Sequence, residues 1–80
     1  MRAIIRFSID GEKDGALSGK LRRYLEKRKF KKLPGRTAIY EHRKTTERKL
    51  RFTMRTFWLT IEQHKGTGRI DHFWMYADHS

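Results

Sequence analysis

The stretch TERKLRFTMRTFWLTIEQHK, residues 46–65, decides the fold because its pattern fits two kinds of secondary structure. Read as a strand, it alternates apolar side chains with arginine and threonine, and residues that favour strands are common in it. Read as a helix, it has Thr46 in the capping position, a glutamate in the first turn and Gly66 just past its end. We predict the helix, because it explains more apolar positions and both ends. Its inward stripe would consist of Leu50, Met54, Phe57 and Ile61.

The chain before this stretch predicts a strand, a helix and further extended structure. Residues 2–10 alternate, with apolar side chains on one face, as a half-buried strand does. Asp14 can cap a helix whose leucines follow helical spacing as far as Arg28. Residues 30–33 read as extended, and residues 36–43 resume a strand after the break at Pro-Gly.

The last segment, RIDHFWMYADHS at 69–80, predicts a strand with apolar or aromatic side chains on both faces. The order is then strand, helix, a strand that Pro-Gly can break in two, helix, strand. We predict one α+β domain over residues 1–80, a ferredoxin-like sandwich whose antiparallel sheet carries two helices on one face. The other face would stay open. It should collect Arg2, Ile4, Arg6, Tyr40, His42, His72, Trp74 and Tyr76.

An open face with aromatic and arginine side chains suits two uses. Unpaired bases can stack on such rings while cations track the nucleic-acid backbone. Alternatively, the face is buried against a second copy of the chain, which would also enlarge the core of a small domain. A shifted register would instead turn the rings inward. We favour the homodimer, with Tyr40, Trp74 and Tyr76 in its interface.

Positive charge is concentrated in the middle of the chain. The 80 residues carry a net charge of +11, and residues 20–55 hold 15 of the 20 lysines and arginines beside only three acids. Such residues can simply solvate helix surfaces. A field this strong also attracts phosphate backbones, so we predict binding of RNA or DNA. The expected phosphate contacts are Arg22, Arg23, Lys27, Arg48, Arg51 and Arg55.

The cysteine content, the N-terminal residues and the motifs of the sequence bear on the cellular compartment of the protein and on the kinds of site that it can form. It has no cysteine, which excludes disulfides and fits a reducing cytoplasm. The N-terminal residues resemble neither a signal peptide nor a membrane span, so we expect a cytoplasmic protein with no membrane contact. The sequence also has no metal-binding signature, glycine-rich phosphate loop or nucleophile elbow.

The candidates for catalysis are one acid and two histidines. Asp10 follows the first strand, where it could hold a hydrated Mg²⁺ against phosphate, and two such acids could meet in a dimer. The stronger alternative is that Asp10-Gly11 is a turn dipeptide, in which the aspartate bonds to its own backbone. His42 and His72 could act as general base and acid on an RNA 2′-hydroxyl, although a surface histidine often has no such role.

The sequence resembles a group of small ferredoxin-like nucleases. The group includes the minor subunit of the CRISPR spacer-adaptation complex and the VapD and GhoS-type endoribonucleases of toxin-antitoxin systems. The segments that carry the resemblance are AIIRFSID, LRRYLEKRKFKKL, TAIYEHR and GRIDHFWMYAD. The resemblance implies a homodimer of facing sheets that binds duplex or structured nucleic acid and, in some members, cuts RNA at an acid matched here by Asp10. The group has tyrosine or serine directly before that acid, whereas Ile9 separates Ser8 from Asp10 here.

Two functions therefore stand as predictions. The first is a basic homodimer that binds nucleic acid and can be an endoribonuclease with Mg²⁺ as its cofactor. The second is a small inhibitor or adaptor, of the type that mobile elements encode, whose basic surface occupies an acidic or nucleic-acid-binding surface of a larger protein.

Overall fold

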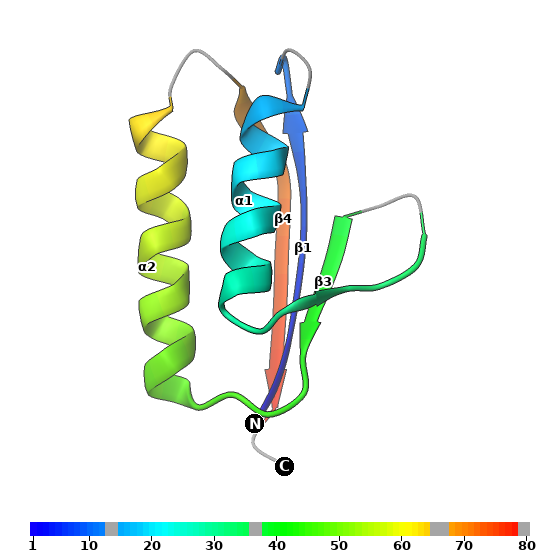
Figure 1. The fold of residues 1–80 in the computed structure, drawn as a ribbon, viewed down its shortest axis with the longest axis vertical. Coiled ribbons are helices and arrows are strands. Elements are labelled where there is room, and N and C mark those ends of the chain that lie inside the picture. The colour runs from blue at the N-terminus through cyan, green and yellow to red at the C-terminus, as the bar shows by residue number, and fades with distance from the viewer. Residues whose placement is uncertain (13–14, 36–37, 65–67, 79–80) are drawn as a thin grey trace.

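Two helices lie on one face of an antiparallel sheet (Figure 1). The structure, a computed structural model, describes residues 1–12, 15–35, 38–64 and 68–78. Neighbouring strands follow the order β2 (Lys31–Lys32), β3 (Ala38–His42), β1 (Arg2–Asp10) and β4 (Arg69–Asp78), and each neighbouring pair is antiparallel. The predicted α+β ferredoxin-like sandwich is therefore confirmed. Its elements are β1 (Arg2–Asp10), α1 (Ala16–Lys27), β2 (Lys31–Lys32), β3 (Ala38–His42), α2 (Glu47–Gln63) and β4 (Arg69–Asp78).

The predicted helix within residues 46–65 is confirmed as α2, Glu47–Gln63, and its start is well capped. The Lys49 N–H donates to Thr46 Oγ1 over 3.2 Å, which satisfies one of the free N–H groups of the first turn. Leu50 and Phe57 of the predicted stripe are buried, and Met54 and Ile61 are partly buried. The 3.6-residue period thus outweighed the strand propensity of the same residues. Gly66, the predicted stop, lies outside the described residues.

The first helix begins differently from the prediction. The proposed cap, Asp14, lies outside the described residues. Gly15 occupies the capping position with a left-handed φ of 63°. Glycine has no side chain, so it supplies no capping hydrogen bond. Instead, the Glu12 carboxylate accepts the Ser18 N–H at 3.0 Å and also the Ser18 hydroxyl. A carboxylate at a helix start also complements the helix dipole.

The core lies between the sheet and the two helices. Side chains of β1 and α1 that point into this layer are almost fully buried, and the ring of Phe57 from α2 meets the ring of Phe7 edge-on at 5.3 Å. These contacts hold both helices against the central strand. The inward side chains of β1 and α1 are Ala3, Ile5, Phe7, Leu17, Leu21 and Leu25.

The register of β3 corrects one prediction. Tyr40 pairs with Ile5, and His42 pairs with Ala3. Directly paired residues point to the same side of a sheet, so both side chains face the helices. Tyr40 is only 2% exposed, and its ring stacks on Phe7 at 5.6 Å. The prediction that Tyr40 and His42 lie on the open face is therefore wrong.

The open face has Ile39 and Glu41 where Tyr40 and His42 were expected, because these residues pair with Arg6 and Ile4. No helix within the described ranges is long and apolar enough to cross a membrane.

Candidate nucleic-acid interface

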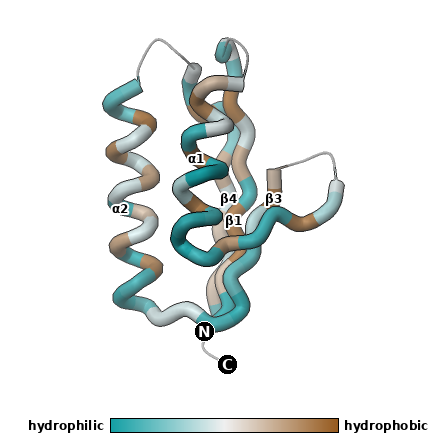
Figure 2. Tube along the Cα trace, in the orientation of Figure 1, coloured by the Kyte–Doolittle hydropathy of each residue, from teal (hydrophilic) through white to brown (hydrophobic). Residues whose placement is uncertain are grey.

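A basic groove runs around the β2 edge of the molecule, from α1 to the start of α2. It consists of four hollows of about 440, 410, 220 and 400 Å³, and neighbouring hollows share Lys29 or Lys32 in their walls. Much of the chain from the end of α1 into β2 is hydrophilic (Figure 2). We call this feature the basic groove. Its basic residues are Arg22, Arg23, Lys27, Arg28, Lys29, Lys31, Lys32, Arg43, Lys44 and Lys49.

One buried ring positions the densest part of the basic groove, the run KRKFKK at 27–32. After α1, Lys29 adopts a left-handed φ of 74°, a conformation that usually needs glycine or asparagine. The turn lets the Phe30 N–H donate to the Leu25 carbonyl at 2.9 Å and sends the Phe30 ring into the core. Lys31 and Lys32 then leave the turn as β2, with exposed side chains. Burial of Phe30 therefore holds the flanking lysines in one place.

The acids beside the groove leave most of its charge unneutralised. Of the described residues in its walls, ten are basic and two, Glu26 and Glu41, are acidic. Glu41 accepts from Arg2 at 2.8 Å and from Arg43 at 3.4 Å, and these bonds lower the pKa of its carboxyl. Glu26 lies 3.3 Å from Arg22. Both acids of the described groove wall are already paired, so this wall holds no further carboxylate to neutralise its other cations.

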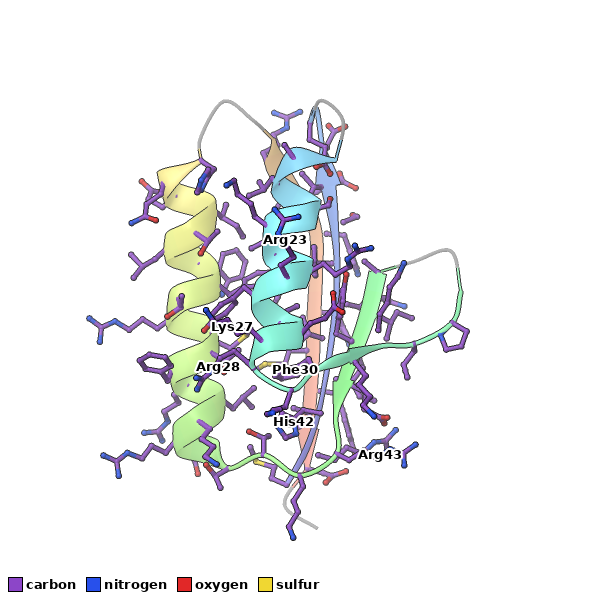
Figure 3. The ribbon with its side chains drawn as sticks, in the orientation of Figure 1. Arg23, Lys27, Arg28, Phe30, His42 and Arg43 are labelled. Carbon is purple, nitrogen blue, oxygen red and sulfur yellow. The ribbon has the colours of Figure 1, made fainter. Side chains whose placement is uncertain are left out.

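The six predicted phosphate contacts separate into two groups. Arg22, Arg23 and Lys27 lie on α1 and line the basic groove (Figure 3). The other three are exposed on α2, but Lys49 and Thr53 are the α2 residues that face the groove. At 100° per residue, Arg48, Arg51 and Arg55 lie on a different side of that helix.

Sequence reasoning missed most of the groove. The contacts that it did not name come from the end of α1, from β2, from the segment between β3 and α2, and from the start of α2. The run KRKFKK was a local signal for part of them. Arg43 and Lys44 join the groove through the pairing of β2 with β3, and Lys49 joins it from α2, beside the end of α1.

His42 lies in the groove wall, beneath the end of α1 (Figure 3). Its Nδ1 accepts the Lys44 N–H at 3.1 Å, and its ring meets Phe30 edge-on at 5.2 Å. Burial is the main cause that lowers the pKa of His42, and the positive charges of Lys49 and the N-terminal amino group lower it further. The neutral imidazole is therefore favoured at neutral pH.

The two candidate histidines do not form one catalytic site. His72 pairs with Ser8 and lies on the open face, 3.4 Å from Arg6 Nη2, whereas His42 pairs with Ala3 on the helix side. They lie on opposite faces and toward opposite ends of β1. The prediction that they act together as base and acid is wrong for one copy of the chain. The alternate side chains of β3 that were expected on the open face, His42 among them, face the helices instead.

Asp10 ends β1 and lies opposite Arg69, with 3.4 Å between Asp10 Oδ2 and Arg69 Nη2. A register shift between Ser8 and Ile9 precedes it. Within the described part of the chain, no three His, Cys, Asp or Glu side chains are close enough together to hold a metal ion. Asp10 is thus a single exposed carboxylate. A Mg²⁺ there would need substrate phosphate or a second copy for further ligands.

Of the three residues predicted for a homodimer interface, two lie on the open face of the sheet, and the interface itself stays a prediction. Trp74 and Tyr76 lie on the open face, where they pair with Arg6 and Ile4.

Comparison of the chain with protein-family models, with curated proteins and with solved structures finds no match. The assignment of a function therefore rests on the geometry of this chain.

Proposed function

We propose that the protein binds nucleic acid by placing the phosphate backbone in the basic groove. The observation that carries this proposal is the ratio of charges: ten basic side chains line four neighbouring hollows, and the two acids of the described walls are already ion-paired. Each phosphate that replaces counterions on such a surface contributes to affinity without reading sequence. The aromatic residues of the described groove wall, Phe30 and Tyr40, are both buried. The groove therefore suits phosphates better than bases.

The test compares two double variants that remove the same charge. Lys31→Gln with Lys32→Gln alters the groove, and Arg48→Gln with Arg55→Gln alters the outer side of α2. Binding of a labelled RNA or DNA hairpin is followed by fluorescence anisotropy over a salt series. We expect the groove variant to bind more weakly and to lower the slope of log K against log salt by roughly 2. Equal losses in both variants would mean that net charge, rather than the groove, holds the ligand.

Cleavage of RNA and formation of a homodimer remain separate predictions. Cleavage would depend on Asp10 and Mg²⁺, so the same hairpin should be cut by the parent protein and stay intact with Asp10→Asn. The alternative function, an inhibitor or adaptor, would use the same groove against an acidic protein surface. An inhibitor or adaptor need not bind free RNA or DNA. Absence of such binding near physiological salt, measured in the salt series, would therefore favour this function over nucleic-acid binding.

A further inference from the structure

The open face of the sheet carries a second group of exposed side chains, which are aromatic, whereas the basic groove is lined by lysine and arginine. Both helices cover the opposite face (Figure 1). Trp74 is 44% exposed and Tyr76 is 43% exposed. Their rings are nearly parallel, 11° apart, with centroids separated by 6.2 Å. Neighbouring exposed aromatic rings on a small soluble domain indicate a binding surface.

Arg6 adds a cation to these rings. Its guanidinium carbon lies 5.5 Å from the centre of the Trp74 ring, a cation–π arrangement. The Arg6 Nε–H is buried and finds no acceptor, and no carboxylate in the described structure pairs with this side chain. Arg2, by contrast, is neutralised by Glu41 on the same face. Arg6 therefore keeps a charge that no carboxylate of the described structure neutralises.

The chemistry of this face favours a nucleotide over a second copy of the chain. An interface between two copies would bury Arg6 without a carboxylate partner, and an unpaired buried charge is costly. Tyr40, which would have made the face more apolar, lies in the core. Two copies would also bring together chains of net charge +11. A nucleotide instead supplies a flat base for the rings and a phosphate for the guanidinium.

We propose that this face is a second nucleic-acid site, which stacks unpaired bases on Trp74 and Tyr76 and holds an adjoining phosphate with Arg6. The inference rests on the nucleic-acid binding proposed above and adds a substrate class to it. The ligand is a single-stranded segment of RNA or DNA. The basic groove contacts its backbone or an adjacent duplex, and the sheet contacts its bases.

Two tryptophans make the site measurable. Trp58, 42% exposed on α2, lies on the helix side of the sheet, where its ring packs on Phe73. The variant Trp58→Phe keeps Trp74 as the fluorescent reporter, and Trp74→Phe keeps Trp58. We expect a short unstructured oligonucleotide to quench the fluorescence of Trp58→Phe and to leave that of Trp74→Phe unchanged. Quenching of both variants, or of neither, would overturn the assignment.

Affinity supplies a second readout. Trp74→Ala and Tyr76→Ala should each weaken binding of the unstructured oligonucleotide by about 5- to 150-fold, the effect of one lost base stack. Binding of a blunt hairpin should stay within about 2-fold, and Trp58→Ala serves as the matched control. The double variant Lys31→Gln with Lys32→Gln should weaken binding of both the oligonucleotide and the hairpin, because it alters the basic groove.

The outcomes separate the two proposals. If the parent protein binds neither ligand, the function proposed for the basic groove fails and this inference fails with it. If hairpin binding depends on the groove but Trp74→Ala and Tyr76→Ala bind the oligonucleotide normally, only the inference about the sheet is wrong. If light scattering finds a dimer that Trp74→Ala converts to a monomer, the face is an interface between copies, which also overturns the inference.

Discussion

At the scale of single residues, the charge of His42 depends on what the fold packs around it. The ring lies against Phe30 and beneath the end of α1, where water is partly excluded. Lys49 and the N-terminal amino group add positive charge nearby, and both effects disfavour a second cation.

This environment predicts how stability depends on pH. Because the pKa of His42 is lower in the fold than in the unfolded chain, its stabilising effect is complete above the unfolded value, about 6.5, and is lost as the pH falls through the folded value. We expect His42→Gln to reduce the fall in melting temperature between about pH 7.5 and about pH 5. An identical fall in variant and parent would contradict the lowered pKa.

At the scale of elements, α2 shows how a helix overcomes ambiguous propensity. Threonine and aromatic residues favour strands, but a strand would leave half of the apolar side chains of this segment without a core. As a helix, the segment buries Leu50, Thr53 and Phe57 on one side and begins at a capped threonine. The Glu47 carboxylate also accepts from Arg51, one turn later.

The cap of α2 can be tested by itself. Thr46→Ala removes the acceptor for the Lys49 N–H, so we expect the free energy of unfolding to fall by about 1 kcal/mol. Thr46→Ser keeps a hydroxyl there and should retain most of the stability. Urea unfolding followed by circular dichroism measures both variants. Equal stability of Thr46→Ala and the parent would show that the cap contributes nothing.

At the scale of the whole molecule, the strand order separates the charged region from the aromatic one. β2 and β4 are the two edges of the sheet, so the basic groove around β2 lies at one side and the aromatic strand at the other. Net charge of +11 on a chain this small produces strong self-repulsion in the folded state. An anionic ligand would relieve it.

This repulsion predicts a salt effect on stability without any ligand. Added NaCl screens the like charges, so we expect the melting temperature to rise from low salt to about 0.3 M. Each kcal/mol recovered corresponds to about 4–8 °C for a domain of this size. The exposed ion pairs, such as Arg22 with Glu26, contribute little and should not reverse the trend. A falling melting temperature would show that ion pairs dominate instead.

Much of the fold could be predicted from the sequence because its signals are local. Helical spacing identified Leu17, Leu21 and Leu25 as inward residues, and alternation identified Ala3, Ile5 and Phe7. The candidate site was predicted less well. The excess of basic residues in the middle of the chain was visible, but three of the six predicted contacts lie outside the groove that the fold builds.

The sequence by itself determined the type and order of the elements, because periodicity and caps act between residues that are near neighbours in the chain. Only the tertiary structure decided the face on which Tyr40 and His42 lie, the separation of His42 from His72, and the gathering of Arg43, Lys44 and Lys49 beside the end of α1. Each depends on contacts between elements that are distant in sequence: the register of the strands and, for Lys49, the packing of α2 beside α1. Alternation defines two faces of a strand, and only pairing with a partner decides which one is buried.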